Sequence, residues 1–163
     1  MTAQKVPTAP TGFLGLQWGD DAADGARRIG LTCDRWEPWI DPAFETSMDL
    51  DHPRAVLGVE GVVGLVRDSR KQLVGVQVIY RDCAANDVRK RQLRDGLSQE
   101  LHVKSTDDAL PYEVWPDRSV VRLATRGDGV CILTVAGPVF GKPYADQLVR
   151  EGVGDLGSAL TPH

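Results

Sequence analysis

Short apolar segments punctuated by turn residues dominate the hydrophobic pattern of the chain. Five of these segments are rich in β-branched or aromatic residues and predict strands, at residues 55–67, 72–80, 112–115, 119–125 and 130–135. The polar run 68–71 has the composition of a hairpin turn between the first two strands. Glycines inside the first strand predict bulges or a close approach by another backbone.

Helical periodicity is clearest in two places. Asp20 can cap a helix that ends at Gly30, since apolar residues between them recur at three- and four-residue steps. Asn86 or Asp87 can cap a second helix that runs to about His102. A narrow stripe of leucines at four-residue steps in this second helix should face the sheet.

A third, short helix is predicted to begin at Pro143 and end near Gly152. The order of elements favours the α+β class, with an antiparallel sheet of about five strands and two main helices on one face. Two tandem helix-plus-strands units would give the same order. We expect one domain over residues 12–152, with residues 1–11 as a solvated tail or tether and residues 153–163 as a frayed C-terminal tail.

The segment from Cys33 to Arg54 has no sustained period and is expected to form a long loop. Its aromatic side chains are costly to leave in water, whereas its acids resist burial, and an interface rim satisfies both. The acids would steer a basic protein partner. The alternative is that the tryptophans fold back onto the domain's own sheet. The predicted partner-binding residues are Trp36, Trp39, Phe44, Asp41, Glu45, Asp49 and Asp51.

Charge is unevenly distributed along the 163 residues, whose net charge is −4. Residues 67–94 hold eight basic and three acidic side chains, so this part is positive and the remainder negative. A secondary basic patch, Arg89, Lys90, Arg91 and Arg94, crowds the first half of the second helix, where the helix dipole disfavours cations. A solvated face or an acidic protein partner explains the patch better than nucleic acid, because no aromatic residue interleaves it and the chain is acidic overall.

The chain carries no specific catalytic or cofactor motif. No serine lies in a GxSxG elbow, and the glycines of residues 58–64 lie within a strand rather than between a strand and a helix. His52 follows Asp49 and Asp51, but a calcium loop needs further oxygen ligands and a glycine turn. We therefore expect no cofactor, no metal and no catalytic residue.

Cys33, Cys83 and Cys131 have neither zinc-ligand spacing nor the pattern of a disulfide framework. Their odd number leaves at least one unpaired thiol, and Cys131 should be buried in a core strand. The N-terminal residues lack the apolar core of a secretory signal, which fits a cytoplasmic protein or an exported one whose signal was removed. The longest nearly apolar stretch is too short to cross a membrane.

The segment GFLGLQWG (residues 12–19), followed by a capped helix and Ile29-Gly30, resembles the opening of small bacterial envelope domains, many of them lipoproteins. The resemblance covers roughly the first 20 residues of the expected domain. It implies the tandem helix-plus-strands architecture of β-lactamase-inhibitor-like proteins, which bind partners rather than catalyse reactions.

These observations favour a non-catalytic protein-interaction module, an accessory subunit of a larger bacterial assembly. The alternatives are a small-ligand-binding domain and a small enzyme whose site is assembled from scattered residues. An enzyme should show a cleft in which titratable groups converge, whereas an interaction module should show an apolar or charged patch.

Overall fold

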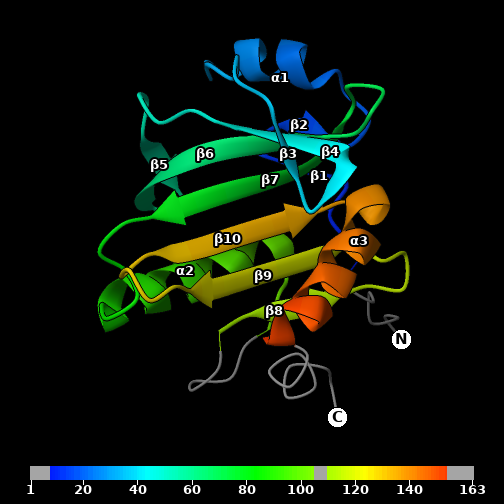
Figure 1. Cartoon of the computed structure of the whole chain (residues 1–163). Coiled ribbons are helices and arrows are strands. Elements are labelled where there is room, and N and C mark those ends of the chain that lie inside the picture. The colour runs from blue at the N-terminus through cyan, green and yellow to red at the C-terminus, as the bar shows by residue number, and fades with distance from the viewer. Residues whose placement is uncertain (1–7, 105–109, 154–163) are drawn as a thin grey trace, which may run out of the picture.

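A computed structural model describes residues 8–104 and 110–153 and shows one large antiparallel sheet with helices on both faces (Figure 1). The strands are β1 (Gly12–Phe13), β2 (Leu16–Gln17), β3 (Glu37–Trp39), β4 (Asp41–Met48), β5 (Arg54–Val56), β6 (Val59–Arg67), β7 (Leu73–Tyr80), β8 (Tyr112–Val114), β9 (Val120–Thr125) and β10 (Cys131–Ala136). The helices are α1 (Ala22–Arg28), α2 (Asp87–Leu101) and α3 (Pro138–Leu148), and a π-helical segment, Val149–Val153, follows α3. No helix in these described ranges is long and apolar enough to span a bilayer.

The expected α+β class and antiparallel sheet are confirmed, but the predicted number of strands was wrong. The main sheet has eight strands, in the order β3-β4-β6-β7-β10-β9-β8 with β5 paired to β6 beside this path. A separate two-stranded hairpin, β1-β2, forms from the GFLGLQWG segment.

The additional strands were missed for local reasons. Segment 33–54 is not a loop, because β3 and β4 form a hairpin in it. Pro38 and Pro42 argued against strands in this segment, since proline is rare inside strands and is tolerated mainly at sheet edges. The predicted strand 55–67 is split into β5 and β6 by a tight turn in which Leu57 (φ 57°) and Gly58 (φ 80°) are both left-handed. Leucine is an unusual residue for such a turn.

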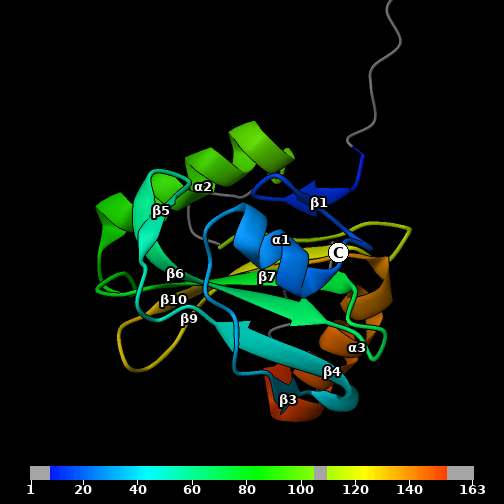
Figure 2. The ribbon, with the colours of Figure 1, turned by 90° about the horizontal axis from the view of Figure 1, so that it is seen from above.

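The pairing of β7 with β10 joins the two halves of the sheet. Its register runs from Cys131 opposite Tyr80 to Ala136 opposite Gly75. On one side lie β3 to β6, and on the other lie β9 and β8. The chain reaches β8, at the far edge, through α2, which lies on the opposite side of the sheet from α3 (Figure 2).

The first two predicted helices pack on one face of the sheet. Ala22 and Ala26 of α1 join Leu93 and Leu97 of α2 in the larger core cluster, and all four are at most 2% exposed. The predicted leucine stripe is therefore confirmed at these two leucines. The expected cap of α1 was one residue early, because the side chain of Asp21 accepts the N–H of Asp24.

The third helix differs from the prediction in both position and start. Pro138 occupies the first turn of α3, and Pro143 lies inside the helix. Phe140 and Tyr144 place α3 on the face opposite to α1 and α2, in a second core cluster. The sheet is therefore covered by helices on both faces, not on one.

Two glycines of the sheet allow side chains to pack closely on the α3 face. A Cβ atom at Gly75 would lie 3.1 Å from Cδ2 of Phe140, and one at Gly64 would collide with the side chain of Met48. The glycines of β6 were predicted to admit another backbone, and at Gly64 the group that packs most closely is instead the side chain of Met48. Phe140 can rest directly on β7, which fixes the depth of α3 on the sheet.

A disulfide joins Cys83 to Cys131 across 48 residues, with the Cα atoms 5.4 Å apart. Both residues are fully buried, so the predicted burial of Cys131 is confirmed, whereas the cysteine spacing alone gave no indication of this pairing. The pair forms because β7 and β10 run side by side, and Cys131 stands opposite Tyr80, the last residue of β7, three residues before Cys83. Cys33 is the free thiol.

Removing this disulfide should destabilise the protein. Replacing Cys83 and Cys131 by alanine releases a loop of this length, which corresponds to about 4 kcal/mol of unfolding free energy. For a domain of this size we expect the melting temperature to fall by about 10 °C. Calorimetry of this variant beside Cys33→Ala tests the claim. Melting temperatures within 2 °C of each other for the two variants would contradict it.

Candidate protein-binding site

The structure places two of the predicted aromatic residues beneath α3. The ring centroid of Trp39 lies 5.2 Å from that of Phe140, and that of Phe44 lies 5.1 Å from the same ring. Phe44 is only 6% exposed, and Trp39 is half-buried and also contacts Tyr144. These contacts stabilise the β3-β4 hairpin on the sheet. A partner-binding role for the two residues stays a prediction.

The third aromatic residue, Trp36, lies on the other side of the hairpin. The guanidinium of Arg67 stacks over the Trp36 ring, 4.0 Å from its centroid. Arg67 also forms an ion pair with Glu45 at 3.0 Å. Both side chains therefore have partners within the domain.

The side chain of Asp49 is buried, with 2% of its surface exposed, and it is hydrogen-bonded to neighbouring segments. Its carboxylate accepts the N–H groups of Thr32 at 2.9 Å and Asp51 at 3.2 Å, and Nδ1 of His52 lies 3.0 Å from it. Burial raises the pKa of Asp49, but the N–H of Thr32 and the imidazole of His52 outweigh burial and hold this pKa below its usual value. Asp51 is exposed. The side chain of Asp41, which begins β4, lies outside the described part of the structure.

The charge of Asp49 should stabilise the fold in a pH-dependent way. A carboxyl group whose pKa is lower in the folded state contributes stability above its unfolded pKa and loses it as the pH falls through its folded pKa. We expect Asp49→Asn to lower the unfolding free energy by about 2 kcal/mol at pH 7, and by much less below about pH 3.

Urea denaturation at both pH values measures this difference, with Asp51→Asn as the exposed control. An Asp49→Asn effect that is as large at pH 2.5 as at pH 7 would show that the carboxylate charge contributes nothing.

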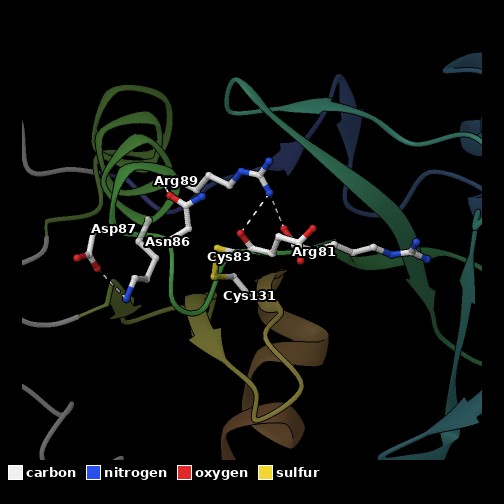
Figure 3. Close-up of a disulfide and its surroundings, with 8 residues drawn as sticks. Arg81, Cys83, Asn86, Asp87, Arg89 and Cys131 are labelled. Carbon is white, nitrogen blue, oxygen red and sulfur yellow. Dashed lines mark hydrogen bonds and ion pairs between the residues drawn. A yellow bond between two sulfur atoms is a disulfide. The ribbon is translucent and has the colours of Figure 1, made fainter.

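The basic residues of α2 are partly engaged with their own surroundings (Figure 3). Arg89 donates from Nη1 to the carbonyl oxygens of Arg81 at 2.9 Å and Asp82 at 3.2 Å. Lys90 lies 3.3 Å from the carboxylate of Asp87. In the same patch, Arg91 is exposed and Arg94 is half-buried with interactions of its own. The predicted basic patch therefore consists of side chains on one helix that do not converge on one point.

A cleft of about 440 Å³ lies between the β5-β6 turn, the end of β7 and the start of α2. We call it the hairpin cleft. Arg81 and Arg89 line it together with Glu60 and Asp82, so its charges balance. Leu50, on its rim, is 64% exposed.

The charged side chains of Glu60, Arg81, Asp82 and Arg89 line the hairpin cleft, and the described residues show no metal site beside them. No group of three histidine, cysteine or acidic side chains in residues 8–104 and 110–153 is placed to hold a metal ion. His52 is instead paired with Asp49. Burial raises the pKa of the Cys33 thiol to about 11, which keeps it protonated and unreactive at neutral pH.

The α3 face of the sheet carries an uncovered apolar row. Four residues are paired directly across β6, β7, β10 and β9, in the order Val62, Ile79, Ile132 and Ala124. We call this row the open face. Figure 1 views the sheet from the side of α3, which lies near the end of β10 that is remote from Ile132.

The open face lies beside the hairpin cleft. Val62 is 5% exposed, and Ile79, Ile132 and Ala124 are half-buried. Val62 and Ile79 also line the hairpin cleft, so the exposed Leu50 lies beside them. The side chains of Ile79, Ile132 and Ala124, near the strand ends, are therefore partly accessible on this face with no helix over them in the described residues.

Sequence reasoning did not identify the open face. Its isoleucines have the same β-branched context as the buried residues beside them, so the sequence pattern does not distinguish the two sets. The available signal was that apolar Ile79 points to the face of β7 opposite to Val76 and Val78, so that some cover is expected on each face.

Comparisons with family models, with curated proteins and with solved structures find no match for this chain.

Proposed function

We propose that the protein is a non-catalytic protein-interaction module and an accessory subunit of a larger bacterial assembly, with the open face as its principal binding surface. The observation that supports this function is the row Val62, Ile79, Ile132 and Ala124, which is apolar, continuous across four strands and not covered by α3. Contiguous exposed apolar surface with a polar rim is typical of interaction sites.

The shape and surroundings of the open face suit a protein partner. Four cross-strand neighbours form a rigid surface, so binding requires little ordering of the module itself. Leu50 at the rim is exposed and offers a further apolar contact. Arg81 and Arg89, in the adjoining cleft, lie close enough to the rim to pair with acidic groups of a partner.

The Cys83–Cys131 disulfide favours an oxidising compartment for the proposed module. Structural disulfides persist outside the cytoplasm and are rare within it. A buried disulfide in the central ladder is a structural one. The protein would then act in the bacterial periplasm or envelope, as the resemblance of its GFLGLQWG segment also implies. We also propose that the order of helices and strands reflects two tandem helix-plus-strands units.

The proposal is tested by measuring binding of the partner protein that co-purifies with the tagged full chain under mild conditions. We expect Ile79→Gln with Ile132→Gln to weaken its binding at least thirtyfold, because truncating two central apolar contacts costs about 2 kcal/mol or more. Val88→Gln, at a 74% exposed residue on α2, is the matched control. A wild-type monomer with no companion, or equal binding by both variants, would contradict the proposal.

The same assay separates the open face from the predicted aromatic surface. Since Trp39 packs on Phe140, we expect Trp36→Ala with Trp39→Ala to lower the melting temperature by several degrees and to retain binding at the open face. Lost binding with an unchanged melting temperature would move the interface to the β3-β4 hairpin.

A further inference from the structure

A second cleft, also of about 440 Å³, opens beside Trp18 at the start of α3. We call it the Trp18 cleft. Its apolar walls include Trp18, Val74 and Val139, and its charged lining residues are Asp68 and Asp117. Because α3 lies between this cleft and the open face, the two surfaces are separate.

Trp18 is held rigidly as one wall of this cleft. Its backbone N–H donates to Thr11 at 3.0 Å, and its indole Nε1–H donates to the carbonyl oxygen of Pro10 at 3.0 Å. The ring also packs against Gly137, where a Cβ atom would lie 2.8 Å from Cγ of the indole. Only glycine leaves room for the ring at this position.

Trp18 packs against the larger core cluster but keeps part of its surface exposed. Phe13 and Leu16 of the same GFLGLQWG segment enter the core, with 6% and 1% of their surfaces exposed. Trp18 is half-buried and lines a cleft whose far wall, Val139, is 59% exposed. Aliphatic and aromatic groups that line the same cleft are suited to binding an apolar side chain.

The rim of the Trp18 cleft is negative. Asp68 is fixed by the N–H groups of Arg70 at 2.9 Å and Gln72 at 3.0 Å, and Asp117 accepts the N–H of Ser119 at 2.9 Å. No lysine or arginine is among the described residues that line the cleft. The α3 N-terminus contributes the equivalent of about half a positive charge, which is less than the two carboxylates supply.

We infer that the Trp18 cleft binds a segment of a protein partner that presents an apolar side chain next to a lysine or arginine. The apolar side chain would lie between Trp18 and Val139, and the cation would pair with Asp68 or Asp117 and with the indole face. The cleft opens to solvent past Val139, which suits one side chain of a longer chain better than a free small molecule that needs most of its surface buried.

The test uses ¹⁵N NMR of the full chain, in which the Trp18 indole signal is assigned with Trp18→Phe. The probes are the peptides Ac-Lys-Leu-Lys-NH2, Ac-Glu-Leu-Glu-NH2 and Ac-Lys-Ser-Lys-NH2. We expect the Lys-Leu-Lys peptide to shift the Trp18 indole signal saturably with a Kd of about 1 mM, typical of a small fragment. The other two peptides should bind at least tenfold more weakly.

Variants assign the charge selectivity to the rim. Asp68→Asn with Asp117→Asn retains the oxygens that accept the backbone N–H groups, and it should weaken binding of the Lys-Leu-Lys peptide about fivefold. Asp95→Asn, at an exposed acid on α2, is the matched control and should leave the Kd unchanged.

Three results would overturn the inference: equal binding of the glutamate peptide, shifts confined to the other tryptophan indoles, or an unchanged Kd in the double variant with an unchanged melting temperature. Since the open-face variants leave this cleft intact, failure here is distinguishable from failure of the proposed function.

Discussion

The pairing of β7 with β10 is the constraint on which the rest of the structure depends. Within the described residues it is the ladder that joins β3–β6 to β8–β9, and it brings together strands separated by α2 and by the β8-β9 hairpin. Contacts so distant in sequence are entropically costly to form. The Cys83–Cys131 disulfide at the end of this ladder reduces that cost by restricting the unfolded chain. The open face exists only because this junction places Ile79 opposite Ile132.

The incomplete cover of the sheet follows from the size of one helix. An α-helix with its side chains is about 10 Å wide, whereas the eight residues of β7 extend about 26 Å. Because α3 crosses the strands, it covers one end of each and leaves the other end bare (Figure 1). Gly75 fixes where it crosses by admitting Phe140. The Trp39 and Phe44 rings then extend this cover toward β4, not toward the open face.

Much of the fold could be predicted from the sequence, because β-branched runs and helix caps act locally. The strands β7, β9 and β10 and the helix α2 agree with the predicted segments to within about a residue at most ends. The β3-β4 hairpin was not predicted because it contains Pro38 and Pro42, and the β5-β6 turn was not predicted because it contains a left-handed Leu57. Each of these residues is unfavourable in the element that contains it. The disulfide and the side of the sheet that α3 covers depend on contacts between distant segments.

The candidate site was harder to predict for the same reason. Ile79 and Ile132 resemble Val78 and Leu133 in composition and in sequence context, but Val78 and Leu133 are buried in the cluster beneath α1 and α2, whereas Ile79 and Ile132 lie on the α3 face, at the end of the strands that α3 does not cover. The aromatic residues of segment 33–54 were predicted to bind a partner because they are mixed with acidic residues, which resist burial. Their contacts with Phe140 and Arg67 give that mixture a role within the domain.

Accessibility of the isoleucine methyl groups tests the account most directly. Methyl NMR with a soluble gadolinium agent measures it for each residue, with the fully buried Leu133 and the 74% exposed Val88 as internal references. The account predicts that the methyl groups of Ile79 and Ile132 relax clearly faster than those of Leu133 in the free protein. Relaxation of both isoleucines at the rate of Leu133 would show that the face is covered, and would contradict the proposed binding surface.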